Sequence, residues 1–545
     1  MTRRIAFVTA AYVLLTVVMT WPYVNYGAFA SATYGGDQRL IVWTLAWDNH
    51  AVLDWQPLFQ SNLFFPAQHS LQYNEHLFGV SLFTLPWAAA GASPILAHHA
   101  TWWLAFPLNG LAAWLLIRRS VASDVAAFVG SLVFVFSFYV MSHAHGHLHL
   151  IWLWPIPLSL LLFERWFDAP TLPRLARWTA VALIGLLTSW YVAVFLVVAH
   201  ALFAVLLVAP RAGGPWRTRL RQFGLATIVM AAVVYPFARH YGQISSSRVE
   251  VVDNSADAAS YVMPPANSLV GRELLTRGDT RPREIWGETT LFTGWVALSA
   301  AIAGGLLFAA RRPRNARAWL LPLLAVTAGL LSFGPSIPGI GITPFAPFNA
   351  LAALPGLDGI RAPARFAALM NLGLAGLIAT AVAGVMTRFG RAGLVATLAL
   401  VPLMLAEWFV VEFPAGKPAP HAIPAIYQTA EVRGARSLVS LPEYTDSVEW
   451  VRGANYLLYS TVHWRPIVNG FGRTMPPGHG GVVATVRAFP ESIPRMRALG
   501  IQYVVVHADR FPDAAASLLA AAEGRADCRL VRRIDTDYLF ELLPE

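Results

Sequence analysis

An acidic residue, Asp37, stands between two glycines and a tryptophan-rich segment in the stretch GGDQRLIVWTLAWDNH, residues 35–50. Gly35 and Gly36 allow another part of the chain to approach the backbone closely. The apolar residues that follow are typical of a helix lying at a membrane surface. A carboxylate held at the start of such a helix can accept a proton from a substrate hydroxyl. We therefore expect Asp37 to be a catalytic base.

Other titratable side chains follow in the same part of the chain. Asp48 and Asp54 are expected to be solvated loop acids, because most charged side chains face water. Glu75 and His76 stand together in QYNEHLFG, just before the next apolar run. Their position at the edge of a membrane segment makes them candidates for binding a polar substrate.

Four histidines alternate in SHAHGHLHL, at the outer end of an apolar run: His143, His145, His147 and His149. In an extended segment all four would share one side, and in a helix they would divide between two faces. Imidazole is a common zinc ligand, but no carboxylate at ligand spacing accompanies them. We favour hydrogen bonding to a polar ligand at the membrane edge, with His145 and His147 as candidates. Zinc binding and plain interfacial packing are the alternatives.

Two further groups place charges at the ends of apolar runs. Glu288, in RPREIWGETTLFTGW, lies within a turn or two of a span. An unpaired charge is costly there, so a salt-bridge partner or a ligand is implied. Arg361 and Arg365, in GIRAPARFAAL, would share a helix face, although Pro363 can place the helix start between them. Paired guanidinium donors suit a phosphate at headgroup depth; generic contact with lipid headgroups is the simpler alternative.

The composition identifies a membrane protein. Of the 545 residues 56% are hydrophobic and 13% charged, which is too little charge to cover a soluble surface. The formal net charge of +10 comes from short arginine clusters between apolar runs, an orientation signal and not a nucleic-acid surface. The single cysteine, Cys528, excludes an internal disulfide. No P-loop, GxGxxG, GxSxG or HExxH motif supports ATP-driven transport or nicotinamide chemistry.

The arginine clusters predict the topology. Apolar runs cover about 5–23, 77–96, 100–117, 124–142, 148–163, 178–209, 222–238, 291–310, 318–334, 366–386 and 393–413. All five arginine-rich loops fall in the cytoplasm if run 77–96, with its prolines, lies in the interface or re-enters. Run 178–209 must then be two spans, broken near Ser189. The result is eleven spans, with the N-terminus inside and the C-terminus outside. Ala28 marks an alternative signal-peptide cleavage site, but the first run exceeds the usual ~7–15 residues.

The predicted architecture is a polytopic α-helical membrane domain, residues 1–413, followed by a small periplasmic α/β domain, residues 414–545. Three outer loops belong to the membrane domain, and they cover residues 27–99, 239–290 and 335–365. In the tail, strand-like runs at 437–442, 501–507 and 538–543 surround helix-like runs at 482–499 and 511–524.

The layout resembles the glycosyltransferase-C superfamily of polytopic membrane enzymes, in an uncharacterised bacterial branch. The pattern GD…W.LAW…P…F.…FP…SL.Y.EH in residues 36–76 carries the resemblance, together with GIRAPARF (359–366) and HWRPIVNGF (463–471). This resemblance implies a catalytic acid in the first outer loop, here Asp37, followed by membrane-parallel helices. It also implies that Arg361 and Arg365 hold a lipid-linked phosphate. Superfamily members often place two acids together, whereas Gln38 and Arg39 follow Asp37, which counts against a divalent metal as cofactor.

The resemblance implies transfer of a sugar from a polyprenyl-phosphate donor to a glycan, lipid or protein acceptor at the outer face of a bacterial inner membrane. Such an inverting transfer needs one base and charge stabilisation at the leaving phosphate. A transporter or flippase of a lipid-linked saccharide is one alternative, but it would place charges near mid-bilayer. A non-catalytic envelope scaffold is another. The partners expected are the lipid donor, the acceptor and membrane lipids, without nucleic acid.

Overall fold

The computed structural model describes residues 2–21, 35–208, 215–241, 247–277, 287–411, 423–444, 450–472 and 474–544. The chain divides into two compact units. We call Met1–Asn25 with Thr101–Pro414 the helical unit, and Tyr26–Ala100 with Ala415–Glu545 the mixed unit. The second division falls between Pro414 and Ala415. All of the expected outer loop 27–99 lies in the range of the mixed unit, which also contains the tail.

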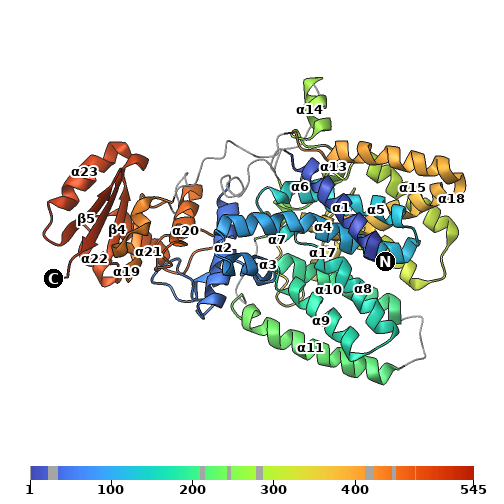
Figure 1. The fold of residues 1–545 in the computed structure, drawn as a ribbon, viewed down its shortest axis with the longest axis horizontal. Helices are drawn as coiled ribbons and strands as arrows, with labels where there is room; N and C mark the ends of the chain where they lie inside the picture. Colours follow the sequence, from blue (N-terminus) through green and yellow to red (C-terminus); the bar gives the residue numbers. More distant parts are fainter. Residues whose placement is uncertain are drawn as a thin grey trace. The chain divides into compact units, whose positions relative to one another are not determined.

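The helical unit is built from apolar helices with short connections (Figure 1). Its elements are α1 (Thr2–Met19), α4 (Pro94–Val121, which begins in the mixed unit), α5 (Asp124–Phe136), α6 (Phe138–Ala144), α7 (Leu148–Ile151), α8 (Pro155–Asp168), α9 (Leu172–Leu186), α10 (Trp190–Val208), α11 (Trp216–Ala238), α12 (Arg248–Asp253), α13 (Ala258–Val262), α14 (Leu269–Thr276), α15 (Trp295–Arg311), η3 (Ala316–Trp319), α16 (Leu320–Ser332), β1 (Ser336–Ile337), β2 (Gly341–Ile342), α17 (Pro347–Ala352), η4 (Pro363–Phe366) and α18 (Ala367–Trp408).

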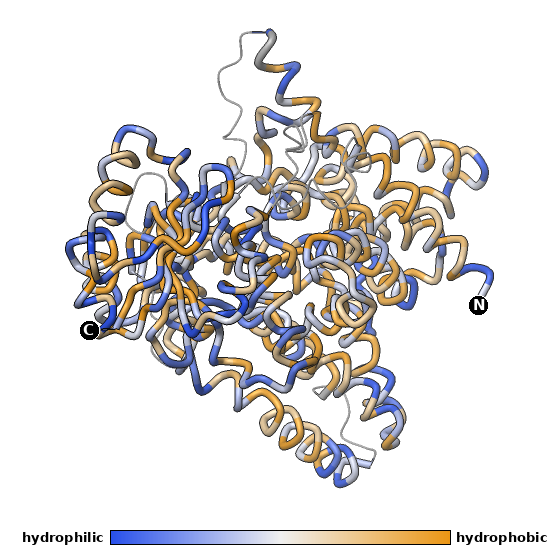
Figure 2. The backbone as a smooth tube through the Cα atoms, turned by 60° about the vertical axis from the view of Figure 1, so that its left-hand side comes forward, coloured by the Kyte–Doolittle hydropathy of each residue, from blue (hydrophilic) through white to orange (hydrophobic). Residues whose placement is uncertain are grey.

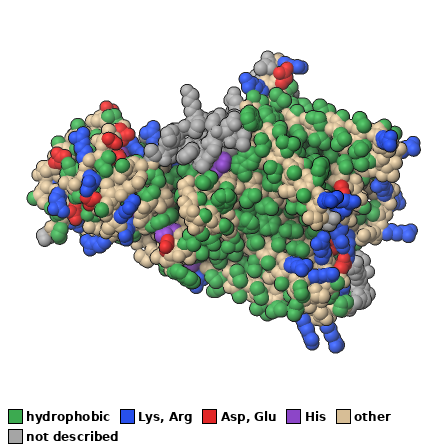
Figure 3. Space-filling view, in the orientation of Figure 1, with side chains coloured by type: hydrophobic (Ala, Val, Ile, Leu, Met, Phe, Trp, Pro, Cys, Tyr) green, Lys and Arg blue, Asp and Glu red, His purple; other side chains and the backbone are tan. Residues whose placement is uncertain are grey.

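Within the described ranges, six helices are long and apolar enough to cross a membrane, or seven if the bent pair α5 and α6 is one span. Three shorter apolar helices accompany them, at Phe78–Ala89, Trp295–Arg311 and Ala316–Ser332. The long helix α18 consists of two helices joined at Gly390, whose φ of 53° is one that glycine adopts readily. Hydrophobic side chains cover most of the helical part in Figure 3, and the tube in Figure 2 is mainly hydrophobic there. The chain is a multi-pass membrane protein.

The basic loops meet at one end of the helices. Arg119 donates to Glu164 at 2.6 Å, and Arg317 donates to the same carboxylate at 2.6 Å. Near the N-terminus, Arg4 pairs with Asp124 at 3.0 Å. Four segments far apart in the sequence are therefore tied together by ion pairs, which places their arginines on the same side of any membrane that the helices cross.

The mixed unit combines helices from the first loop with a sheet from the tail. The first loop contributes α2 (Gly36–Leu53), η2 (Ser70–Tyr73) and α3 (Phe78–Ala89), and the tail contributes η5 (Ala425–Gln428), α19 (Ala430–Gly434), β3 (Leu438–Leu441), η6 (Trp450–Gly453), α20 (Ala454–Ser460), α21 (His479–Arg487), α22 (Ile493–Ala498), β4 (Tyr503–His507), η7 (Ala508–Arg510), α23 (Pro512–Glu523), β5 (Cys528–Ile534) and β6 (Asp537–Leu542). The sheet order is β3-β4-β6-β5, with β3 parallel to β4 and the other pairs antiparallel.

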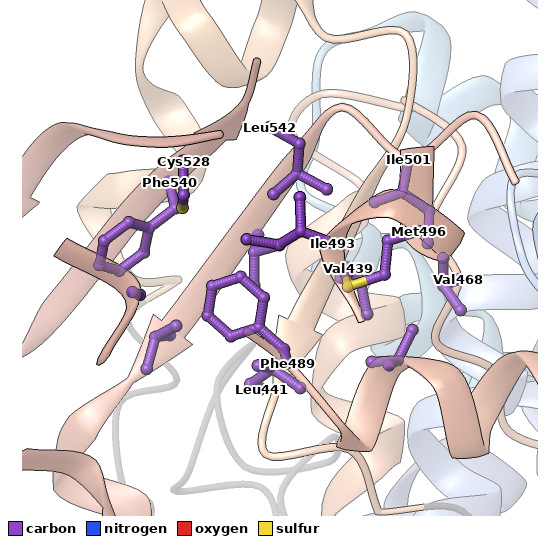
Figure 4. Packing of buried hydrophobic residues seen from close by; sticks show 14 residues of the cluster. Val439, Leu441, Val468, Phe489, Ile493, Met496, Ile501, Cys528, Phe540 and Leu542 are labelled. Atoms are coloured by element: carbon purple, nitrogen blue, oxygen red, sulfur yellow. The ribbon is translucent and has the colours of Figure 1, made fainter. Parts of the chain in front are cut away.

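The sheet buries an apolar core against α21 and α22. Val439, Phe489, Ile493, Met496 and Phe540 are among the residues of this core, all at most 3% exposed (Figure 4). The three strand-like runs of the tail coincide with β3, β4 and β6. The sequence analysis missed β5, CRLVRRI, because it lies at the sheet edge and most of its side chains face solvent. Such a strand has no continuous apolar run by which to recognise it.

The tail segment NGFG, residues 469–472, packs against the first loop. A Cβ on Gly470 would lie 2.0 Å from the Phe64 ring, and a Cβ on Gly472 would lie 2.2 Å from Asn74. The Phe65 amide donates to the Ile467 carbonyl at 2.9 Å. Glycine is therefore required where the two segments meet, and the tail holds the first loop by backbone as well as side-chain contacts.

Candidate active site

In the helical unit, a buried ion pair links two of the expected site residues. Glu288 precedes α15, and Arg365 lies in η4, the turn before α18. The Arg365 Nε donates to Glu288 Oε2 at 2.9 Å, and a second guanidinium nitrogen contacts Oε1, so the pairing is bidentate. The Arg365 side chain is only 3% exposed, against 20% for Glu288. Burial opposes ionisation, but Arg365 and His143 together hold the pKa of Glu288 well below its usual range.

The imidazole of His143 completes this cluster. Its Nδ1 lies 2.7 Å from the Tyr139 carbonyl oxygen, which can only accept, so Nδ1 carries the hydrogen. Its Nε2 lies 3.4 Å from Glu288 Oε2. In the neutral ring this nitrogen is also an acceptor, so two acceptors face each other. A hydrogen bond between His143 and Glu288 therefore requires the protonated imidazole.

Tyr191, at the start of α10, also contacts the guanidinium of Arg365. The Arg365 Cζ lies 4.3 Å from the centre of the Tyr191 ring, a cation–π distance. The Tyr191 hydroxyl accepts from the Ala362 amide at 3.0 Å, which anchors the turn that carries Arg365. The expected break in the run 178–209 occurs here, because α9 ends at Leu186 and α10 begins at Trp190.

Arg361 differs from Arg365 in its environment. It lies before the turn η4 and not on a helix face shared with Arg365. Its guanidinium reaches Glu250 at 3.3 Å, and the two side chains are 34% and 30% exposed. The two arginines thus have separate carboxylate partners, and Arg361 is the one whose guanidinium is accessible to a ligand.

The histidine segment forms the corner between α6 and α7. The rings of His143 and His147 are 5.8 Å apart, and those of His147 and His149 are 5.9 Å apart. His145 is half-buried beside them; burial and the neighbouring His147 lower its pKa to about 4, so it is neutral at ordinary pH. His147 therefore contacts His143, which in turn contacts the Glu288–Arg365 ion pair. His143 belongs to the histidine segment noted in the sequence, but it was not among the expected binding residues. Among the described residues no group of three potential ligands is arranged to hold a metal ion.

Asp37 belongs to the mixed unit, in the first turn of α2. Gly35 is the N-cap, and the Asp37 side chain is exposed, whereas Gln38 and Arg39 beside it are buried. A Cβ on Gly36 would lie 2.2 Å from the tip of the Phe471 ring. Phe471 in turn stacks on Trp450 with ring centres 4.8 Å apart. Because Gly36 has no side chain, the Phe471 ring of the tail can pack directly against the start of α2. This contact helps to hold the turn that carries Asp37.

Replacing Gly36 by alanine is expected to destabilise the protein by about 1–3 kcal/mol, the usual cost of overpacking a close contact. The added methyl would force the Phe471 ring away from Trp450. Thermal unfolding in detergent measures this effect. Gly35→Ala is the matched control, because its Cβ would meet nothing closer than the Asp37 nitrogen at 4.0 Å. Equal stability of the two variants would show that the Gly36–Phe471 contact does not constrain α2.

Glu75 and His76 lie in the mixed unit between η2 and α3. His76 is partly buried, which lowers its pKa to about 3, and its Nδ1 accepts from the Phe78 amide at 3.1 Å. The neighbouring Asn74 donates to the Phe471 carbonyl at 3.2 Å. Phe471 therefore touches both Gly36 and Asn74, the residues that directly precede Asp37 and Glu75. The same tail segment supports both parts of the first loop.

Asp48 corrects one expectation. It was expected to be a solvated loop acid, but it is fully buried on α2. Burial raises its pKa well above the usual range, and the Ser81 hydroxyl offsets only part of this effect. The error arose because the loop forms a helix covered by tertiary packing, which a single acidic residue in the sequence does not reveal. Asp54, in contrast, is 59% exposed and pairs with His50 at 2.6 Å.

The raised pKa of Asp48 makes the stability of the protein depend on pH. The folded state holds a neutral acid while the unfolded chain ionises, so the stability contributed at low pH is lost as the pH rises through the folded pKa. Asp48→Asn removes this dependence. Its melting temperature should exceed that of the wild type at pH 7–8, and the difference should disappear below about pH 4. A difference independent of pH would show that Asp48 is ionised in the folded protein.

Residues 6–405 match the profile of a protein family described as a domain of unknown function, DUF6311. The chain belongs to the DUF6311 family. No curated protein has a matching sequence. The fold of this DUF6311 protein is similar to that of the arabinofuranosyltransferase AftD from Mycobacteria, with a TM-score of 0.58 and 15% identity, covering 100% of this chain and 40% of AftD.

A structure of the AftD mutant R1389S gives a TM-score of 0.59 at 15% identity, covering 100% of this chain and 42% of that one. The structure of ArnT from Cupriavidus metallidurans bound to undecaprenyl phosphate gives a TM-score of 0.48 at 12% identity, covering 98% of this chain and 97% of ArnT. The DUF6311 chain spans well under half the length of AftD. At such identity the likeness to AftD shows that the two proteins share a fold, and nothing beyond the fold.

Three residues that make contacts in these clusters were not predicted from the sequence. Tyr191 was seen only as part of a break between spans, and Phe471 only as part of a motif. His143 was passed over for its neighbours. Each acts through a contact with a residue distant in sequence, so no local spacing could have identified it. The glycine at position 36, next to an acid, was the one signal that another segment approaches there.

Proposed function

We propose that the protein is a membrane glycosyltransferase that transfers a sugar from a polyprenyl-phosphate-linked donor to a cell-envelope acceptor. The observation that carries this proposal is the similarity of the whole chain to the AftD fold. The exposed Asp37 supports it, because the acid lies in the first turn of a helix that is buried on its other sides.

In the proposed reaction Asp37 is the general base. Its carboxylate takes the proton from the acceptor hydroxyl as the oxygen attacks the anomeric carbon, and the bond to the donor phosphate breaks with inversion. The leaving phosphate needs a cation close to where its charge develops. Arg361 suits this role, since its guanidinium is partly exposed and its contact with Glu250 is a single one. Arg365 would act indirectly, by holding Glu288 and the turn η4.

Glu288, His145 and His147 are proposed to line the site for the sugar at the outer membrane edge, and Glu75 and His76 to bind polar groups beside Asp37. A neutral His145 offers one donor and one acceptor. The carboxylate of Glu288 offers acceptor oxygens for sugar hydroxyls. A divalent metal is not part of the proposal.

We also propose eleven spans, with the N-terminus in the cytoplasm and the C-terminus outside. Among the described residues we assign the eleven spans to α1, α4, α5–α6, α7–α8, α9, α10, α11, α15, α16 and the two halves of α18 on either side of Gly390. The ion pairs of Arg4, Arg119 and Arg317 gather the basic loops at one end, as the positive-inside rule requires. Residues 77–96, with α3 in the mixed unit, are left out of the count.

Reporter fusions test this topology. Fusions after Arg119, Arg221 and Arg317 should show cytoplasmic activity, because these arginines resist translocation. Fusions at Gly278 and at the C-terminus should show periplasmic activity. A cytoplasmic C-terminus would contradict the eleven-span arrangement and would place the tail on the wrong side for an outer-face reaction.

A deletion strain tests the function. If the protein transfers a sugar, its loss should leave the lipid-linked sugar in the membrane while one envelope glycan lacks the corresponding residue, both measurable by mass spectrometry. Expression of the wild-type protein in this strain should restore the missing sugar of the glycan, and expression of the Asp37→Asn protein should not. If the protein were a flippase, its loss would instead leave the lipid-linked sugar on the cytoplasmic leaflet. An unchanged glycan and lipid pool would refute the transferase.

A further inference from the structure

A cavity of about 750 Å³ lies within the mixed unit, between the C-terminal half of α2 and the tail. Its volume is within the range of about 300–1,000 Å³ typical of small-molecule sites. Trp47 and His50 line it from α2, and Trp464 lines it from the tail. Trp47 is ten residues beyond Asp37 on the same helix, so the cavity is about 15 Å from the proposed base. It is a separate site.

The walls of the cavity combine aromatic rings with neutral polar side chains. His50 stacks on Trp464 with ring centres 4.4 Å apart and an angle of 8° between the planes. Gln56, Gln68 and Asn62 line the cavity as well. Side-chain amides both donate and accept hydrogen bonds, as do the hydroxyl groups of a sugar. The flat apolar face of a pyranose or furanose ring fits against an aromatic ring, which has an apolar body.

The charge of the cavity favours a neutral ligand. Asp54 pairs with His50 at 2.6 Å, and burial lowers the pKa of His50 although Asp54 acts in the opposite direction. Among the described residues that line the cavity, Arg465 carries the one guanidinium, and it donates to the Arg433 carbonyl. One carboxylate and one guanidinium leave no excess of either charge, so neither a phosphate nor a uronic acid is selected.

The backbone conformation of Trp464 is also unusual. Its φ is 54°, in the left-handed region that a large side chain rarely adopts. Such a conformation has a cost, and it persists only where the surrounding structure enforces it. Here it directs the Trp464 ring onto His50 at the cavity wall.

We propose that this cavity binds a neutral oligosaccharide, with the Trp464–His50 stack against a sugar ring and the amides of Gln56 and Gln68 on its hydroxyls. The site does not depend on the proposed transfer reaction. It would retain a glycan on the protein whether that glycan is an acceptor, a product or an anchoring polymer of the envelope.

Binding to the purified full-length protein in detergent tests the proposal. The probes are neutral trisaccharides of glucose, mannose and arabinose, with trigalacturonic acid as the anionic comparison, followed by saturation-transfer NMR and tryptophan fluorescence. At least one neutral trisaccharide should bind, and trigalacturonic acid should bind more weakly. Trp464→Gly should weaken binding at least about tenfold, as expected for removal of an aromatic anchor, while glycine accommodates the positive φ.

Trp55→Gly is the matched control. Trp55 has the same φ of 54° and is 93% exposed, but it does not line the cavity, so its removal should leave binding unchanged. If Trp464→Gly unfolds, the exposed pair Gln56→Ala and Gln68→Ala replaces it and should also weaken binding. The proposal is overturned if no neutral trisaccharide binds, if trigalacturonic acid binds as well as the neutral probes, or if the Trp55 and Trp464 variants lose binding equally.

Discussion

Replacing Arg365 by methionine should lower the stability of the protein by about 3–5 kcal/mol, the usual cost of removing one partner from a buried ion pair. Methionine fills a similar volume but leaves the Glu288 carboxylate without its bidentate partner, and His143 is then its remaining contact among the described residues. The contact with the Tyr191 ring is lost too. A large fall in the melting temperature in detergent would report this change.

Arg361→Met is the matched control, since Arg361 is four residues away and also paired with a glutamate. Its pair with Glu250 is about one-third exposed on each side and should contribute no more than about 1 kcal/mol. The proposed roles predict opposite patterns for the two variants. Arg361→Met should weaken use of the lipid-phosphate donor with little loss of stability, and Arg365→Met should lose stability first.

The double variant Arg365→Met with Glu288→Gln separates the structural role of the pair from a role in the site. Neutralising both partners removes the uncompensated charge, so most of the lost stability should return. If Glu288 only balances Arg365, sugar transfer returns as well. If Glu288 binds the sugar, the double variant is stable but transfers poorly. A double variant as unstable as Arg365→Met alone would contradict the ion-pair explanation.

The sequence predicted the membrane architecture better than the site. Apolar runs and arginine clusters are local properties, and they indicated the helices of the first unit and the break before Trp190. The position of Glu288 next to an apolar run implied a partner, because an unpaired charge there is unfavourable. That the partner is Arg365, 77 residues further on, depends on tertiary packing and could not be read from spacing.

The packing of the tail against the first loop could not be predicted from the sequence either, because it also depends on tertiary contacts between distant residues. Gly36 and Phe471 are more than 400 residues apart, and neither residue type identifies the other. The burial of Asp48 has the same origin: in isolation α2 would expose it, and only its neighbours in the mixed unit exclude water. Nothing in the sequence therefore indicated that Asp48, in the middle of α2, is buried.

The largest effect on activity is expected for Asp37→Asn. The substitution keeps the shape of the side chain and removes the proton acceptor. General-base catalysis contributes about 10²–10⁴-fold, so sugar transfer should fall at least about a hundredfold. Transfer is measured as polyprenyl phosphate released from a lipid-linked donor, with membranes of the deletion strain as the source of acceptor. Binding of the donor should survive, since the base contacts the acceptor and not the lipid phosphate.

An acid in the first turn of a helix also stabilises that helix, by about 0.3–1 kcal/mol through the helix dipole. Asp513→Asn controls for this effect, because Asp513 is an exposed acid in the first turn of α23. Both asparagine variants should lose the same small amount of stability, and only Asp37→Asn should lose transfer. Full transfer by Asp37→Asn would leave the carboxylate as a helix-stabilising acid. A loss of folding without a loss of turnover per folded molecule would lead to the same conclusion, and the base would then have to be sought elsewhere in the first loop, with Glu75 the next residue to replace.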